Sequence, residues 1–191
     1  MVARWRRAAD LMTLARASSA AATEALALTD GTWLRLRRLG SDDRDGLAAL
    51  FARLSPESRR RRFLSPKPEL TARELAYLTD VDHFHHEAIA AVDQRDGSIV
   101  GVGRYARVAD RAGVADLAIE VADELQRMGI GTELARRTLQ RARGNGFTFL
   151  TATTLRENRP ARALLRRLGF RACASNGSEI EYELELDPQG D

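Results

Sequence analysis

The sequence predicts a single mixed α/β (α+β) domain, in which strands lie on both sides of central helices. Three observations lead to this prediction. The chain of 191 residues has the length of one domain, and its 44% hydrophobic content is enough for a core. Strand and helix patterns follow one another in mixed order. No internal repeat and no linker divides them, so we expect an N-terminal extension at residues 1–29 and one domain at residues 30–191.

The first half of the domain is expected to hold one strand and three short helices. Residues 32–37 alternate polar and apolar side chains, which is typical of a half-buried strand. The Ser-Asp-Asp sequence at 41–43 is expected to cap a helix that runs to residue 54, and proline follows serine at 55–56 to begin a second helix. Residues 64–68 break that helix. Thr71 and Glu74 then form a capping box for a third helix through Leu78.

The second half alternates strands and helices. Apolar runs bounded by turn residues and glycines predict them. Apolar residues at helical spacing and the Gly-Asn-Gly sequence at 144–146 define the longest helix. The expected elements are strands at 87–92, 99–108 and 114–121, a helix at 132–143, a strand at 147–153, a helix at 159–168 and a strand at 180–186.

Composition excludes several classes of protein. The 30 basic and 27 acidic residues leave a net charge of +3, and Lys67 is the only lysine, so we interpret the arginine bias as compositional and expect no nucleic-acid binding. No apolar run approaches the roughly 20 residues of a membrane-spanning helix. The single cysteine, Cys173, excludes an intrachain disulfide and a cysteine metal cluster, which suits a cytoplasmic protein. The arginine-rich N-terminus loosely resembles a transit peptide, and we interpret it as a poorly ordered or loosely packed helix.

The most informative segment is a glycine loop between the strand at 114–121 and the longest helix. It reads Gln126-Arg127-Met128-Gly129-Ile130-Gly131. Glycines let backbone N–H groups approach a ligand, and the first N–H groups of the helix lack intrahelical partners. The segment alone fits two interpretations equally, which are a tight turn and a cradle for a phosphate group.

A second signal lies downstream, at the start of the helix expected at 159–168. Asn158 precedes Pro160 and Ala161, and a Leu-Gly-Phe sequence follows at 168–170. On local grounds, Asn158 is either a helix N-cap or an amide that hydrogen-bonds a ligand.

Taken together, the strand, the Q-x-x-G-x-G loop, the long helix, the next strand and the N-x-x-A sequence resemble the GCN5-related N-acetyltransferase (GNAT) superfamily over residues 32–186. The middle of the chain looks most like the acetyltransferase domain of bacterial protein lysine acetyltransferases. The segments that carry this second resemblance are Leu54-Ser55-Pro56-Glu57-Ser58-Arg59 with Arg62-Phe63, Asp80-Val81-Asp82, and Gly101-Val102-Gly103-Arg104-Tyr105.

The resemblance implies a mostly antiparallel sheet with helices on both faces and acetyl-CoA bound where two strands splay apart. Backbone groups of Ile119 and Val121 would pair with the pantetheine arm, and Asn158 would contact the pantetheine or the thioester. Gln126 would begin the pyrophosphate motif, and the backbone amides of Arg127, Met128, Gly129, Ile130, Gly131 and Thr132 would hold the pyrophosphate.

Transfer to an amine needs a base, because a lysine ammonium with a pKa of about 10.4 must lose a proton before it attacks. Asp116 and Glu120 are spaced to share one face of their strand. The resembling enzymes have a glutamate base where this chain has the shorter Asp116, so both residues stay candidates, each with the alternative of a solvated strand carboxylate. The Val121 N–H is expected to polarise the thioester carbonyl.

This chain departs from the resembling family at the general acid. The family's tyrosine is replaced by Leu165, and Tyr105 and Tyr182 are either substitutes or core aromatics. A thiolate is a fair leaving group without such an acid. His83, His85 and His86 have no matching ligand set, so no metal is expected. The arginine run at 59–62 is expected to be a solvated helix face, with an acidic protein surface or the nucleotide 3′-phosphate as alternative contacts.

The sequence therefore predicts a bacterial, cytoplasmic N-acetyltransferase that uses acetyl-CoA and is a monomer or homodimer. A protein lysine is the first acceptor considered and a small-molecule amine the second. A third reading is an acyl-CoA-binding regulatory domain without turnover. An arginine-rich nucleic-acid binder would explain the pI of about 9.6 but neither motif.

Overall fold

The computed structural model describes residues 24–28 and 31–186, which form one eight-stranded sheet in the order β1-β2-β3-β4-β5-β6-β8-β7. Every neighbouring pair is antiparallel except β5 and β6, which run parallel. The mixed, mostly antiparallel sheet predicted from the sequence is therefore confirmed. The strands are β1 (Glu24–Ala27), β2 (Trp33–Arg38), β3 (His86–Asp93), β4 (Ile99–Arg107), β5 (Val114–Val121), β6 (Phe149–Leu155), β7 (Arg171–Asn176) and β8 (Glu179–Glu185).

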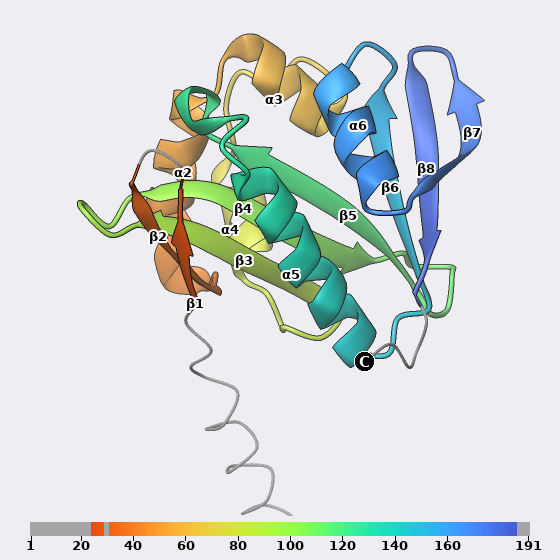
Figure 1. The fold of residues 1–191 in the computed structure, drawn as a ribbon, viewed down its shortest axis with the longest axis horizontal. Helices are drawn as coiled ribbons and strands as arrows, with labels where there is room; N and C mark the ends of the chain where they lie inside the picture. The colour runs from red at the N-terminus through yellow and green to blue at the C-terminus, as the bar shows by residue number, and fades with distance from the viewer. Residues whose placement is uncertain (1–23, 29–30, 187–191) are drawn as a thin grey trace, which may run out of the picture.

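Helices cover both faces of the sheet, with α5 crossing the front of β3, β4 and β5 and α6 standing before β6, while α2 and α4 lie behind (Figure 1). α3 lies near the ends of β5 and β6, which it contacts. The helices and 3-10 turns are η1 (Ser41–Asp43), α2 (Arg44–Arg53), α3 (Pro56–Phe63), α4 (Ala72–Thr79), η2 (Asp123–Leu125), α5 (Ile130–Gly144) and α6 (Arg159–Arg167).

The core lies in two layers because the central strands are covered on both faces. Seven of the eight residues of β3 are buried, as expected for a strand between helix layers. β2 instead buries only alternate residues along its first half, which matches its alternating sequence. The capping box of Thr71 and Glu74 forms as predicted, and the hydroxyl of Ser55 caps the helix that begins at Pro56.

Three features differ from the sequence-based prediction. β1 lies inside the segment expected to be an extension, because pairing with β2 outweighs the helical preference of its Glu-Ala-Leu-Ala sequence. β7 was not predicted, since all six of its residues are exposed and carry no alternating pattern. The Ser-Asp-Asp sequence at 41–43 forms the turn η1 instead of a side-chain cap, because Asp43 accepts from the Gly40 N–H and pairs with Arg37. Residues 1–23 lie outside the described residues.

Close packing of α5 on β4 sets the position of the glycine loop. A Cβ atom added at Gly103 would lie 2.7 Å from the Thr138 hydroxyl and 3.1 Å from Leu134, so only glycine allows this approach. α5 begins at Ile130, two residues earlier than predicted, because Gly129 takes the left-handed conformation (φ 89°) and serves as its N-cap. The start of the helix therefore lies beside the end of β5.

The parallel strands β5 and β6 separate after a short contact. Pairing extends only from Val114 to Asp116 on β5, opposite residues 149–151 of β6. Beyond Asp116, β5 continues beside β4 while β6 continues beside β8. The sheet therefore opens into a wedge whose narrow end lies at Asp116 and Thr151.

Candidate functional site

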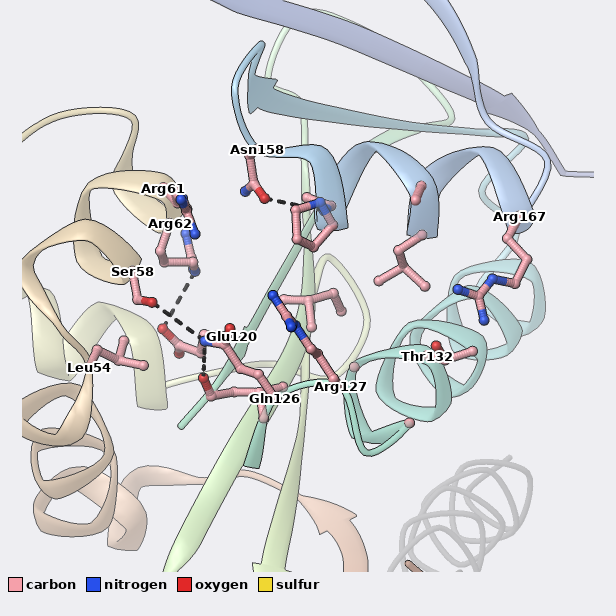
Figure 2. A pocket seen from close by; sticks show the side chains of 18 residues that line it. Leu54, Ser58, Arg61, Arg62, Glu120, Gln126, Arg127, Thr132, Asn158 and Arg167 are labelled. Carbon is pink, nitrogen blue, oxygen red and sulfur yellow. Dashed lines mark hydrogen bonds and ion pairs between the residues drawn. The ribbon is translucent and has the colours of Figure 1, made fainter. Parts of the chain in front are cut away.

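A pocket of about 470 Å³ occupies the wedge (Figure 2). Its walls come from four segments that are far apart in sequence, namely α3, the end of β5, the glycine loop with the start of α5, and α6. The lining residues are Leu54, Ser58, Arg61, Arg62, Ile119, Glu120, Val121, Gln126, Arg127, Gly129, Gly131, Thr132, Asn158, Pro160, Ala161, Ala163, Leu164 and Arg167.

The exposed backbone edge of β5 forms one wall of the pocket. Ala122 donates its N–H to Val100 of β4, so by the two-residue alternation of an antiparallel ladder the N–H of Glu120 also points toward β4. The N–H and C=O groups of Ile119 and Val121 therefore point the other way, toward the open wedge. An extended, amide-bearing ligand can pair with this edge as an added strand does.

The glycine loop closes the wide end of the wedge. Its shape needs left-handed residues, since Arg127 (φ 66°) and Gly129 both have positive φ. The first N–H groups of α5 emerge there, where an anion is favoured by the unpaired donors and by the helix dipole. Arg127 from the loop and Arg167 from α6 add positive charge to the same pocket.

The Gln126 side chain stabilises the loop. Its amide nitrogen lies 3.2 Å from the Val121 carbonyl, 3.0 Å from Asp123 Oδ1 and 3.4 Å from the Ser58 hydroxyl. Gln126 therefore ties the loop both to β5 and to α3. Because it engages the Val121 carbonyl, the N–H of Val121 is left as the donor facing the wedge.

The structure brings most of the predicted donor-binding residues together and turns two side chains away. Ile130 is 1% exposed and packs in the core, where Met128 also packs, so only their backbone groups face outward. The predicted residues that line the pocket are Ile119, Glu120, Val121, Gln126, Arg127, Gly129, Gly131, Thr132 and Asn158.

Asn158 combines the two roles that the sequence left open. Its Oδ1 accepts a hydrogen bond from the Ala161 N–H at 3.2 Å, which caps α6. Asn158 also lines the pocket, with its side chain at the mouth between α3 and α6 (Figure 2). The side-chain amide nitrogen is not needed for the cap, so it can donate to a ligand.

Asp116 lies outside the pocket lining, at the narrow end of the wedge. Its Oδ1 accepts a hydrogen bond from the Thr151 hydroxyl at 2.9 Å. Loss of surrounding water raises the pKa of Asp116, and Glu181 raises it further, while Thr151 and Arg62 oppose this. The Asp116 side chain is nevertheless exposed, so water and an amine that must lose a proton can reach it.

Glu120 lies inside the pocket, between two arginines. Its side chain is 6% exposed, and its Oε2 lies 3.5 Å from Nε of Arg62 on α3. Arg104 on the adjacent strand β4 is 4% exposed, and burial lowers its pKa to about 10, which the nearby Glu120 carboxylate opposes. Asp116 and Glu120 share one face of β5 but stand roughly 13 Å apart along the strand, so one small group cannot contact both directly.

The arginine run at 59–62 is not the solvated helix face that was predicted. All four side chains are partly buried and paired. Arg59 stacks on Phe51 with its guanidinium carbon 4.5 Å from the ring centroid, and Arg60 pairs with Glu157. Arg61 pairs with Glu57 on its own helix, and Arg62 pairs with Glu120. The prediction failed because the partners are distant in sequence in two of these cases.

Several pocket residues were missed by sequence reasoning. They belong to α3 and to the body of α6, and include Ser58, Pro160, Leu164 and Arg167. The only signal that pointed to α3 was its segment's resemblance to one enzyme branch. Nothing in the sequence of α6 distinguishes pocket-facing residues from those of an ordinary amphipathic helix.

The two tyrosines considered as acids are core residues. Tyr105 is 0% exposed, donates its hydroxyl to the Phe84 carbonyl and accepts from Asn145. Burial raises the pKa of Tyr105 to about 12. Tyr182 is 1% exposed and belongs to the same hydrophobic cluster, as does Leu165. Neither hydroxyl lines the pocket.

The histidines pair within the chain. Nδ1 of His83 lies 2.6 Å from Glu87, His85 contacts Asp82, and His86 lies beside Arg104. Within residues 24–28 and 31–186, no group of three or more histidine, cysteine, aspartate or glutamate side chains is arranged to hold a metal ion. Among the helices of the same residues, none is long and apolar enough to cross a membrane.

Comparison with known proteins gives a consistent result. Residues 51–170 match the model of the acetyltransferase (GNAT) family. The chain is 34% identical over 145 residues to an acetyltransferase of Pseudomonas aeruginosa, an alignment that covers 75% of this chain and 77% of that protein.

Similarity extends to proteins named Pat. Acetyltransferase Pat of Mycolicibacterium smegmatis is 28% identical over 158 residues, and the chain spans about half of that protein, since the alignment covers 83% of the chain and 47% of Pat. The solved GNAT domain of S. lividans PAT superposes with a TM-score of 0.79 at 24% identity, covering 86% of this chain and 97% of that domain. This last comparison supports the fold.

Proposed function

The chain belongs to the acetyltransferase (GNAT) family and is an acetyl-CoA-dependent acetyltransferase, and on this premise we propose that its acceptor is a protein lysine. The similarity to acetyltransferase Pat of Mycolicibacterium smegmatis supports this choice of acceptor. The resemblance of the α3 segment to bacterial protein lysine acetyltransferases supports it as well.

The observation that carries the assignment of the acetyl-CoA site is the open backbone edge of β5 with the glycine loop at its end. The edge at Ile119 and Val121 suits the amides of a pantetheine arm, and the start of α5 suits a pyrophosphate. Arg127 and Arg167 would neutralise phosphate charge. The residues therefore fit acetyl-CoA, which supplies the activated acetyl group as a thioester.

We assign the proton-accepting role to Asp116. A base works best when its pKa lies nearer the working pH than that of an ordinary aspartate, and the raised pKa of Asp116 moves it in this direction. Its exposure allows a bridging water to carry the proton from the acceptor amine. Glu120, which pairs with Arg62, is better suited to hold a cation than to take a proton.

The remaining requirements are a polarised carbonyl and a leaving group. The Val121 N–H faces the wedge while Gln126 engages the Val121 carbonyl, so this N–H can donate to the thioester oxygen. A thiol with a pKa of about 8.5 leaves as thiolate without a strong acid. The mechanism therefore does not require a tyrosine at the position of Leu165.

Two measurements test the proposal. Calorimetric titration with acetyl-CoA should show binding, and lysine-bearing proteins or peptides should then cause release of free CoA, with acetyl-lysine found by mass spectrometry. Asp116→Asn should preserve binding and reduce release by a factor of roughly 100 or more, as expected for loss of a general base. Unchanged turnover in this variant would contradict the assignment of the base.

The same assay separates the alternatives. Release of CoA with small amines but with no lysine-bearing protein would favour a small-molecule acetyltransferase. Binding of acetyl-CoA without release by any amine would instead indicate a regulatory acyl-CoA-binding domain.

A further inference from the structure

Arg62 lines the pocket beside Glu120. It projects from α3 toward β5, with its side chain 14% exposed and its Nε 3.5 Å from Glu120 Oε2 (Figure 2). Its charge also lowers the pKa of Asp116, so the guanidinium acts on both carboxylates of this face of β5. A cation therefore already lies beside Glu120, the residue before Val121, whose N–H we assign to the thioester oxygen.

The contact between Arg62 and Glu120 is made by a helix without buried residues. α3 is held by packing of Phe63 on Phe51 of α2 and by the Ser55 N–H, which donates to Asp123 at 3.1 Å. Toward the walls of the wedge it also makes the pair of Arg60 with Glu157 and the contact of Ser58 with Gln126. The Nε of Arg62 is buried yet makes no hydrogen bond within the described residues, and 3.5 Å is long for an ion pair. The Arg62–Glu120 pair is therefore a loose one, in which another cation can take the place of Arg62.

A second cation, Arg104, lies near Glu120 and is fixed in place within β4. Arg104 is held in β4 beneath Glu120, and its Nη1 donates to the Leu78 carbonyl at 2.8 Å. Its Nε and Nη2 make no hydrogen bond to any described residue, so its charge is available to the nearby carboxylate. Glu120 thus stays compensated in part when Arg62 moves away.

We propose that Arg62 is an internal substitute for the acceptor ammonium, and that a cationic amine binds by displacing it from Glu120. This inference rests on the proposed function and deepens it, because it defines the acceptor as a primary ammonium on a flexible arm. Arg62 becomes a specificity-determining residue. Glu120 holds the ammonium as it first arrives in the pocket.

Charge conservation is the physical reason for this selectivity. Exchanging a guanidinium for an ammonium leaves the charge beside Glu120 unchanged, whereas a neutral group would leave a buried carboxylate short of a partner. Leaving one member of a buried ion pair without its partner is unfavourable, so neutral acceptors are selected against.

The test compares Arg62→Gln with a matched control, Arg60→Gln. Arg60 lies on the same helix and pairs with Glu157 outside the pocket, so its loss loosens α3 without emptying the place beside Glu120. The probe is Nα-acetyl-lysine methylamide, titrated into CoA-saturated protein and followed by NMR. Its norleucine analogue, which lacks the ammonium, serves as the neutral control.

We expect Arg62→Gln to bind the lysine probe three- to tenfold more tightly than the wild type, because the internal competitor is gone. Arg60→Gln should bind it within twofold of the wild type, and the norleucine probe should show no gain in either variant. In turnover assays, Arg62→Gln should lower KM for the lysine acceptor by the same factor as the gain in binding.

Equal or weaker binding by Arg62→Gln would overturn the inference, because Arg62 would then support the acceptor. A similar gain in affinity for the lysine probe in Arg60→Gln would also overturn the inference, because the gain would then result from a loosened α3. Failure of the wild type to release CoA with any lysine would count against the proposed function alone, since the binding comparison does not depend on turnover.

Discussion

Substitutions of Asn158 can separate its structural role as the cap of α6 from its proposed contact with the ligand. Its Oδ1 caps α6 through the Ala161 N–H at 3.2 Å, while its amide nitrogen faces the pocket. Serine is about as good an N-cap as asparagine but has no amide. Asn158→Ser should therefore keep the cap and lose the ligand contact, whereas Asn158→Ala should lose both.

The expected magnitudes follow from these two contacts. Loss of an N-cap costs about 1 kcal/mol of unfolding free energy, which for a chain of this length lowers Tm by roughly 2–4 °C. Loss of one hydrogen bond to the donor costs about 0.5–1.5 kcal/mol, equivalent to an increase in Kd of roughly 2- to 12-fold.

Urea unfolding and calorimetric titration with acetyl-CoA measure the two effects on the same samples. We expect Asn158→Ser to unfold like the wild type and to bind acetyl-CoA more weakly, and Asn158→Ala to be impaired in both assays. Wild-type affinity in Asn158→Ser would refute the ligand contact. Equal loss of stability in the two variants would refute the cap.

Three further predictions follow from the fold and the loop. Gly103→Ala places a Cβ atom 2.7 Å from Thr138 and should lower the unfolding free energy, measured in urea, by about 1–3 kcal/mol. Gly144 of α5 has open space around it, so Gly144→Ala should leave the unfolding free energy unchanged or raise it by about 0.5 kcal/mol. Equal effects of the two substitutions would contradict the close approach of α5 to β4. Gly129→Glu puts a carboxylate and a strained positive φ at the proposed pyrophosphate site, so calorimetry should detect no acetyl-CoA binding, while retained binding would move the phosphate site elsewhere. Burial, aided by the charge of Arg104, lowers the pKa of His86 from 6.5 to about 4. Between these pH values the unfolded chain binds a proton at His86 that the folded protein does not bind. The unfolding free energy should therefore fall as pH drops from 6.5 to 4. His86→Gln should flatten that fall, and an unchanged pH profile in this variant would refute the assignment.

The segments that we propose for the donor could be recognised in the sequence because they are contiguous. The strand, the glycine loop and the start of α5 follow one another within residues 114–144. Their backbone geometry is dictated locally by glycine at 129 and 131 and by the apolar run of β5. The glycine loop, equally a turn or a cradle from its own residues, lies at the mouth of a pocket in the structure.

The elements that escaped prediction depend on partners rather than on their own residues. β7 has six exposed residues and exists through its pairing with β8, and β1 likewise depends on β2. The capping sequence at 41–43 became a turn because Arg37, six residues before Asp43, takes the aspartate as an ion-pair partner. The local secondary-structure propensity of a segment does not reveal which strand or ion-pair partner it will meet.

By itself, the sequence determined the mixed fold and the family and pointed to the glycine loop as the proposed phosphate site, because each depends on short-range patterns along the chain. Only the tertiary structure distinguished the two carboxylates of β5, placing Glu120 in the pocket and Asp116 at its narrow end. It also decided that Arg62 and Arg104, on α3 and β4, share Glu120. Electrostatic interaction depends on distance in space, and folding brings together charges that lie 16 to 58 residues apart in the sequence.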